Sequence, residues 1–302
     1  MNDSRKKAYQ LIILFGIVSL LGDIIYEGAR SVNGQYLATL GVSAATVGLV
    51  AGVGEFLGYA VRLASGYYSD KTGTYWLFTI IGYALLISVP LISLTGAWQL
   101  AAVCMLGERF GKALRSPAKD VLLSHATSIT GRGFGFGLHE AMDQIGAIAG
   151  PLFFTVIFTL NGDYRKGYAY LSIPFILLMV ILLTARMRIP DPSAIEHANE
   201  PGNPHKNKLT GIFWLYTSFS AFSVLGFANF AVIAYHLKTT HSASDATIPL
   251  LYAIAMGVDA IAALLAGRLY DRTGLRTLIA IPVLTVPAVL LSFSLPFPFI
   301  VT

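Results

Sequence analysis

The sequence predicts an all-helical (all-α) integral membrane protein, and three observations carry that prediction. Of the 302 residues, 55% are hydrophobic and only 12% are charged, whereas soluble domains carry about twice that charged fraction. The mean hydropathy is +0.66. The apolar residues gather in segments of about 20, the length that crosses a bilayer as a helix. Runs such as LIILFGIVSLLG lack the alternating polarity of a transmembrane β-strand.

Nine membrane spans are expected along the chain, each ending at glycine, proline or charged residues. The predicted spans are residues 9–38, 44–68, 75–95, 97–121, 131–160, 166–188, 209–238, 246–268 and 275–296. The one long polar break, residues 189–208, is rich in Pro, Asn and charge and is expected to be a flexible cytoplasmic linker. The chain is therefore divided into a six-helix half at 1–188, this linker, and a second, incomplete half at 209–302.

Lysine and arginine predict the orientation of these spans, because cytoplasmic loops carry an excess of both. With a cytoplasmic N-terminus, the outer loops contain Arg165, Lys166 and Lys238. The inner side then contains Arg5, Lys6, Lys7, Lys71, Arg132, Arg186, Arg188, Lys206, Lys208, Arg268, Arg272 and Arg276. A multi-pass protein of a bacterial inner (plasma) membrane is expected. Because the basic residues are dispersed between apolar segments, the pI of about 9.2 indicates membrane topology and no nucleic-acid partner.

A short phrase occurs twice, each time where an apolar span ends. It reads GYYSDKTG at residues 66–73 and GRLYDRTG at residues 267–274, an offset of 201 residues between 66 and 267. Six spans, a linker and a restart with the same phrase at the same place indicate two parallel repeats. Subtracting 201 maps Thr302 onto Ala101, near the start of the fourth span. The second repeat is thus expected to lack counterparts of spans 4 to 6.

These features resemble the major facilitator superfamily, in which G-x-x-x-D-[RK]-x-G follows the second helix and is echoed after the eighth. The fifth span adds Gly146, Gly150 and Pro151, similar to the helix-packing motif G-x-x-x-G-P found in that superfamily, particularly among antiporters. The resemblance implies a helical bundle of the superfamily type, here with about nine of an expected twelve transmembrane helices. It also implies alternating access, in which two halves rock around a central site.

The resemblance further implies that the repeated phrase latches the cytoplasmic side shut in the outward-facing state. The residues given this gating role are Gly66, Asp70, Lys71, Gly73, Gly267, Asp271, Arg272 and Gly274. A carboxylate at one helix end is attracted to the positive N-terminal end of a neighbouring helix. In the plan that the resemblance implies, Asp271 lies near the backbone of residues 131–135, whereas Asp70 faces an eleventh helix.

Ionisable side chains within the predicted spans are the candidates for solute contacts and proton coupling. Each costs roughly 2.5–3.5 kcal/mol or more at bilayer depth, so such groups usually face a cavity. The candidates are Asp23, Glu27, Arg30, Glu55, Arg62, Glu108, Arg109, Lys112, Arg115, His139, Glu140, Asp143 and Asp259. Helical spacing places several of them on common faces, and opposite charges on neighbouring spans are expected to pair across one central cavity. A histidine and buried carboxylates are suited to proton transfer.

Some of these groups can instead be structural ion pairs that hold helix ends together. The structural interpretation is favoured for Arg115, Lys119 and Asp120, which lie near the interface where long side chains reach water. Pro117 is expected to bend or end this fourth span. A functional role is favoured for the deeper groups Asp23, Glu27, Arg30, Arg109, His139 and Asp143.

An enzymatic alternative rests on the sequence LHEAMD at residues 138–143. It comes within one residue of the zinc-protease motif H-E-x-x-H, but Asp143 stands where the second histidine would be. One histidine and one aspartate with a glutamate between them make a poor zinc site. We therefore expect no enzyme, no metal and no cofactor.

The favoured function is secondary active transport of a small solute by alternating access, with proton coupling expected and antiport or efflux slightly preferred. The expected partners are a small-molecule substrate, protons and the lipid bilayer, while the oligomeric state stays open. The charge of the substrate also stays open, because the fourth span permits an organic anion and the acids of the first and fifth spans permit a cation. The alternative is a truncated, non-transporting membrane protein or sensor, since nine helices do not make two equal halves.

Overall fold

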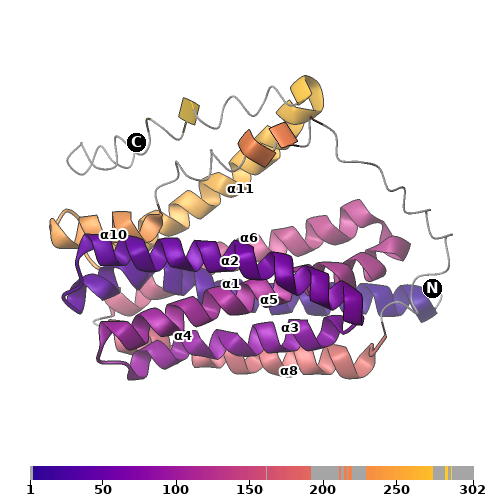
Figure 1. Ribbon diagram of the computed structural model, residues 1–302, viewed down its shortest axis with the longest axis horizontal. Helices are drawn as coiled ribbons and strands as arrows, with labels where there is room; N and C mark the ends of the chain where they lie inside the picture. The colour runs from indigo at the N-terminus through magenta and orange to yellow at the C-terminus, as the bar shows by residue number, and fades with distance from the viewer. Residues whose placement is uncertain are drawn as a thin grey trace.

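Long helices lying side by side form the fold (Figure 1). The computed structural model describes residues 3–160, 162–191, 211, 214–215, 217–219, 229–274, 283–284 and 287. Within these ranges the chain forms helices, turns and bends and no strand. The predicted all-helical bundle is confirmed.

The first three spans lie close to their predicted positions. Helix α1 spans Asp3–Thr39, and α2 spans Ala44–Thr72. The third span is built from short pieces, which are α3 (Tyr75–Ala84), the 3-10 turn η1 (Leu85–Ile87), α4 (Ser88–Leu91) and the 3-10 turn η2 (Ile92–Leu94). Pro90 lies within this interrupted stretch, where its missing N–H removes one helical hydrogen bond.

The rest of the first half consists of α5 (Trp98–Thr130), α6 (Arg132–Thr159), and the pair α7 (Tyr164–Tyr170) and α8 (Ser172–Arg188). Helix α5 continues through Pro117 to Thr130, so the expectation that this span ends near residue 121 is wrong. The proline lies beside Gly66 of α2, where an added Cβ would be 3.6 Å from Pro117 Cβ. Packing between α2 and α5 therefore extends past the proline and supports the helix there.

Five helical segments among the described residues are long and apolar enough to cross a bilayer. They are Arg5–Thr39, Ala44–Thr72, Tyr75–Leu94, Gly135–Thr159 and Tyr164–Arg188. Helix α5 has the length but is not in this group, and it carries a series of charged side chains between Glu108 and Asp120. Charges at that depth are typical of a helix that lines a polar site.

Helix α1 lies at the centre of the bundle and packs against α5, α6, α8 and α10. Its contact with α6 depends on residues without side chains. A Cβ on Gly150 would lie 2.6 Å from Ile24 O and 2.7 Å from Gly28 N, and one on Gly146 would collide with the same helix. The two glycines, with Pro151 following in α6, thus lie where the two backbones approach most closely.

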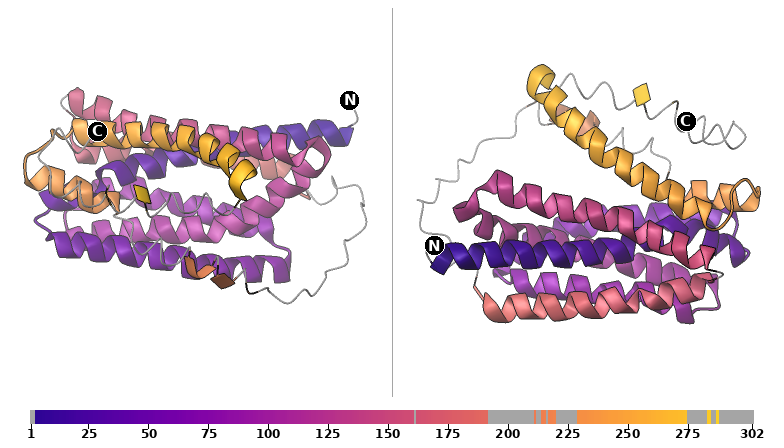
Figure 2. Two further views of the ribbon diagram at one scale, coloured as in Figure 1. Left: turned by 90° about the horizontal axis from the view of Figure 1, so that it is seen from above. Right: turned by 180° about the vertical axis from the view of Figure 1, so that it is seen from behind.

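The described part of the second half consists mainly of α10 (Phe230–Thr239) and α11 (Thr247–Thr273). Helix α10 packs on α1 and α2, and α11 packs on α6 and α1. Toward its C-terminal end α11 diverges from the bundle (Figures 1 and 2). Most of the linker, the beginning of the predicted span 209–238 and most of the ninth span lie outside the described residues.

The helix ends lie on two sides of the molecule. The N-terminal side holds the start of α1, the α2–α3 and α5–α6 turns, and the ends of α8 and α11. The opposite side holds the α1–α2, η2–α5, α6–α7 and α10–α11 connections. The functional groups lie between these two sides.

Candidate functional site

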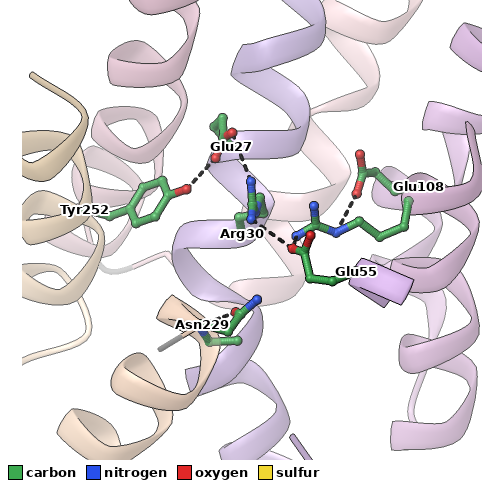
Figure 3. Close-up of polar contacts among 8 residues, drawn as sticks. Glu27, Arg30, Glu55, Glu108, Asn229 and Tyr252 are labelled. Carbon is green, nitrogen blue, oxygen red and sulfur yellow. Dashed lines mark hydrogen bonds and ion pairs between the residues drawn. The ribbon is translucent and has the colours of Figure 1, made fainter. Parts of the chain in front are cut away.

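Charged side chains of α1, α2 and α5 meet in the middle of the bundle (Figure 3). Arg30 Nη1 lies 3.3 Å from Glu27 Oε1, and Arg30 Nη2 lies 3.3 Å from Glu55 Oε1. Arg109 Nη2 lies 3.2 Å from the same oxygen of Glu55. One carboxylate oxygen therefore bridges two guanidinium groups from different helices. We call these three residues, Arg30, Glu55 and Arg109, the ionic bridge.

Two further carboxylates flank the ionic bridge. Glu27 is one helical turn from Arg30 on α1, and this spacing allows the pair to form within one helix. Glu108 on α5 places its Oε2 3.7 Å from Arg109 Nε. Each arginine thus contacts the bridging Glu55 and one acid of its own helix. Both flanking acids are buried.

Tyr252 of α11 connects the second half of the chain to this cluster. Its hydroxyl donates a hydrogen bond of 2.5 Å to Glu27 Oε2 (Figure 3). The Glu27 carboxylate therefore accepts from Arg30 with one oxygen and from Tyr252 with the other. This contact joins α1 and α11 across the interface between the two halves.

Two cavities adjoin the ionic bridge. A cavity of about 50 Å³ is lined by residues such as Asn33, Leu37 and Val47, which lie toward the opposite side. A cavity of about 250 Å³ is lined by Gly58, Tyr59, Arg62 and others, which lie toward the N-terminal side. Arg30 and Arg109 line both cavities. The bridge is thus a barrier between a space on each side of it.

Helix α10 forms one wall of the smaller cavity through Asn229, Phe230 and Ala231. The Asn229 side chain caps this helix, with its Oδ1 accepting from Ala231 N at 3.0 Å. A Cβ on Gly34 of α1 would collide with Ala231 O. The backbones of α1 and α10 therefore touch on the opposite side and close that end of the bundle.

Lys112 extends the basic face of α5. Its Nζ lies 3.7 Å from the centre of the Tyr26 ring, a cation–π contact with α1. Lys112 also lines the larger cavity, together with Arg30, Arg62 and Arg109. Arg62, which is exposed, brings the number of basic side chains around that cavity to four.

A second polar cluster, the Lys119 cluster, lies nearer the N-terminal side between α1, α5 and α6. Lys119 Nζ is 2.9 Å from His139 Nε2 and 3.4 Å from Ser19 Oγ. His139 Nε2 is in turn 3.6 Å from Asp143 Oδ2. The expectation of an interfacial Lys119 at a helix end is wrong, because α5 continues through Pro117 and carries this lysine into the helix contact. Asp23 lies on α1 between this cluster and Glu27.

Four predicted site residues lie apart from both clusters. Arg115 stacks over the Tyr83 ring and donates to Gly82 O at 3.3 Å, a contact between α5 and α3. Glu140 is exposed and accepts from Gln144 at 3.3 Å. Asp259 lies on an exposed face of α11. Arg62 lines the larger cavity but is not one of the residues that form the ionic bridge.

The two copies of the repeated phrase end helices in the same way. Gly73 and Gly274 both adopt left-handed backbone angles, with φ of 65° and 61°, a conformation that glycine reaches without strain. Asp70 and Lys71 are exposed at the end of α2. The structure describes the backbone of α11 here but not the side chains of Asp271 and Arg272, so the expected approach of Asp271 to residues 131–135 stays a prediction.

Glu27, Arg30, Glu55, Glu108 and Arg109 were each candidates from the sequence, and the structure places them together. Tyr252 was not among the candidates. This tyrosine lies in the apolar run PLLYAIAMG and has no spacing pattern that marks it. Ser19 is a second omission. In the part of the chain that the structure describes, no three His, Cys, Asp or Glu side chains are grouped to hold a metal ion.

Comparison with known proteins gives a family and two sets of relatives. The Major Facilitator Superfamily profile matches residues 12–302. Uncharacterized proteins of Mycobacterium bovis and Mycobacterium tuberculosis are 41% identical over 293 residues, which is 95% of this chain and 72% of each relative. An uncharacterized MFS-type transporter of Methanocaldococcus jannaschii is 26% identical over 210 residues, 69% of this chain and 50% of that protein.

Solved structures show the same fold. A bacterial homologue of the human lysosomal transporter Spinster, in an inward-facing and unoccupied conformation, superposes with a TM-score of 0.69 at 16% identity. The match covers 91% of this chain and 64% of the solved one. The inward-facing, occupied form of that homologue gives a TM-score of 0.64 and also 16% identity. This chain therefore spans somewhat less than two thirds of the length of these solved relatives.

Proposed function

Because this chain belongs to the Major Facilitator Superfamily and is a membrane transporter, we propose that it moves a small solute by alternating access, coupled to protons. The observation that supports this most directly is the chain of contacts from Tyr252 through Glu27 to the ionic bridge. It joins the second half to a barrier that separates two cavities. A movement of one half relative to the other therefore acts directly on that barrier.

The structure corresponds, in this proposal, to a state open toward the N-terminal side. Gly34 and Ala231 bring α1 and α10 together on the opposite side, while α11 diverges toward the N-terminal side (Figure 2). The larger cavity lies on that diverging side. Rocking of α10 and α11 over the first half would close the N-terminal side and open the opposite side, as in other transporters built from repeats.

Proton coupling is assigned to Glu27. Its carboxylate is 6% exposed and is stabilised by Arg30 and by the Tyr252 hydroxyl. When the halves rock, the Tyr252 hydroxyl moves away from Glu27, and Oε2 of this buried carboxylate loses its hydrogen-bond donor. A buried charge that loses a partner is stabilised by neutralisation, so proton uptake by Glu27 would accompany the change of state.

Antiport or efflux is the favoured direction, on the strength of the G-x-x-x-G-P resemblance at Gly146, Gly150 and Pro151. Support comes from the position of this motif, since Gly150 lies against Ile24 and Gly28, within one turn of Glu27. A movement of α6 along α1 at this contact would change the surroundings of the proposed proton site.

The test is solute-dependent proton movement in proteoliposomes. The full chain is reconstituted with a pH-sensitive dye inside the vesicles, a proton gradient is imposed, and organic anions, organic cations and neutral solutes are added in turn. We expect at least one class to cause proton flux, and Glu27→Gln to abolish that flux. Asp163→Asn is the matched control, because it removes an exposed carboxylate that caps α7 while asparagine preserves the cap.

Two results would contradict the proposal. Solute-dependent flux that persists in Glu27→Gln would remove Glu27 from the coupling. Absence of flux with every solute class, in vesicles where the protein is folded, would favour the alternative of a non-transporting membrane protein or sensor.

A further inference from the structure

The lining of the larger cavity is strongly basic. Its eight lining residues are Arg30, Glu55, Gly58, Tyr59, Arg62, Arg109, Lys112 and Ala113. Four of these are cationic and one is a carboxylate. From this arrangement we propose that the cavity binds an anionic group of the transported solute, a carboxylate or a phosphate, between Arg30 and Arg109. The inference rests on the proposed function and names the class of its solute.

Apart from Glu55, the acids around the ionic bridge and the Lys119 cluster do not line this cavity. Glu27 is held by Arg30 and Tyr252. Asp143 faces His139 in the Lys119 cluster. Glu108 lies against Arg109 on the side of the smaller cavity. The acids therefore balance charge around the site, while the surface that a solute would touch is basic.

Glu55 occupies the position that the solute anion would take. Its single Oε1 contacts both guanidinium groups, at 3.3 Å and 3.2 Å. Its side chain is 37% exposed, compared with 28% for Arg30 and 17% for Arg109, so it is the partner best able to swing away. Arg30 and Arg109 would then each keep one acid, Glu27 or Glu108, and each present donors to an entering anion.

The geometry of the two arginines suits a carboxylate or a phosphate. A guanidinium group presents its N–H donors in a planar fork that matches the oxygens of either anion. Arg62 and Lys112 line the same cavity and can neutralise a second negative charge. A cavity of about 250 Å³ far exceeds the roughly 10–15 Å³ that one water molecule needs by the same kind of measure, so it has room for a small organic acid or phosphate.

Binding is measured separately from transport, by calorimetric titration of the full chain in phosphatidylcholine nanodiscs. The probes are benzoate, benzylamine and inorganic phosphate. Benzoate and benzylamine carry the same ring with opposite charge, so their comparison isolates the sign of the charge. We expect benzoate, phosphate or both to bind, and benzylamine not to bind.

Two variants test the assignment in opposite directions. Glu55→Gln removes the internal competitor and is expected to tighten anion binding by about fivefold or more, since a charged partner of both arginines is lost. Arg62→Gln, an exposed position that should not affect folding, is expected to weaken it by about fivefold. Arg188→Gln, exposed at the end of α8 and not among the residues that line the cavity, is the control and should leave binding unchanged.

The same titration in nanodiscs with anionic phosphatidylglycerol separates two sources of the anion. Competition by this lipid would assign the site to a lipid headgroup, and no competition would assign it to a free solute. Binding of benzylamine alone, failure of both anions to bind in either lipid, or weaker anion binding in Glu55→Gln would each overturn the inference. Proton-coupled transport of a cation would overturn the anion inference and leave the proposed function intact. Anion binding without any transport would support the anion site and contradict the proposed function.

Discussion

At the scale of single residues, Glu27 makes the contact most directly linked to a change of state. It is a buried carboxylate with a guanidinium on one oxygen and a phenol on the other. The phenol belongs to Tyr252 of α11, and the guanidinium belongs to α1 itself. Loss of the phenol therefore requires only that α11 moves, whereas the contact with Arg30 stays within one helix.

We expect Glu27→Gln and Tyr252→Phe to be non-additive in stability. Tyr252→Phe leaves a carboxylate oxygen without its donor, whereas the same change beside a glutamine removes a weaker, neutral hydrogen bond. The coupling should be about 0.5–2 kcal/mol, the range for interacting groups in folded and membrane proteins. A double-mutant cycle in the free energy of unfolding in mixed micelles measures it. Simple additivity would show that the 2.5 Å contact contributes nothing specific.

The charged part of the site could be predicted from the sequence because bilayer depth makes each charge conspicuous. Glu27 and Arg30 share a helix face by spacing alone, and their pairing follows. Which acid meets which base between helices could not be predicted, since that depends on the relative rotation of α1, α2 and α5. Tyr252 could not be predicted at all, because one tyrosine in an apolar span resembles a packing residue.

At the scale of helices, small residues decide how closely α1 approaches its neighbours. Gly150→Ala would place a Cβ 2.6 Å from Ile24 O and 2.7 Å from Gly28 N, against backbone that cannot rotate away. We expect a loss of about 1–3 kcal/mol in the free energy of unfolding, as for overpacked contacts. Unfolding in the same mixed micelles measures this loss. The added methyl group would also separate α6 from α1 near Glu27.

The matched control for Gly150→Ala is Gly137→Ala. Gly137 belongs to the same helix, α6, but an added Cβ there meets no atom within 4 Å. Alanine favours the helix over glycine by about 1 kcal/mol, so this variant should be neutral or slightly stabilising. Equal effects of the two substitutions would mean that helix propensity, and not the α1–α6 contact, determines the result.

The helices themselves were largely predictable because apolar runs separated by charge mark each span. The end of α5 was not, since a proline followed by Lys119 and Asp120 is typical of a helix terminus. Tertiary packing of Pro117 beside Gly66 overrides that local signal. The start of α10 at Phe230 was likewise unmarked, as Asn229 inside an apolar run gives only a weak sign of a helix cap.

At the scale of the whole molecule, basic residues distinguish the two sides. The N-terminal side carries Arg5, Lys6, Lys7, Lys71, Arg186 and Arg188 among the described residues. In the described part of the chain, the opposite side carries Arg165, Lys166 and Lys238. Lys238 is bound to Asp245 at 2.6 Å, and Lys166 lies 3.9 Å from Asp163. Since lysine and arginine are retained on the cytoplasmic side of a membrane, the N-terminal side is expected to face the cytoplasm.

Cysteine labelling in intact bacterial cells tests this orientation. In a Cys104→Ser background, Ala97→Cys places a thiol in the exposed connection between η2 and α5, and Thr74→Cys places one in the exposed turn between α2 and α3. We expect a membrane-impermeant maleimide to label Ala97→Cys in intact cells and Thr74→Cys only after the membrane is opened. The reverse labelling pattern would show that the protein has the opposite orientation in the membrane. It would also turn the 250 Å³ basic cavity toward the outside, so that the proposed anion site would then load from the external medium.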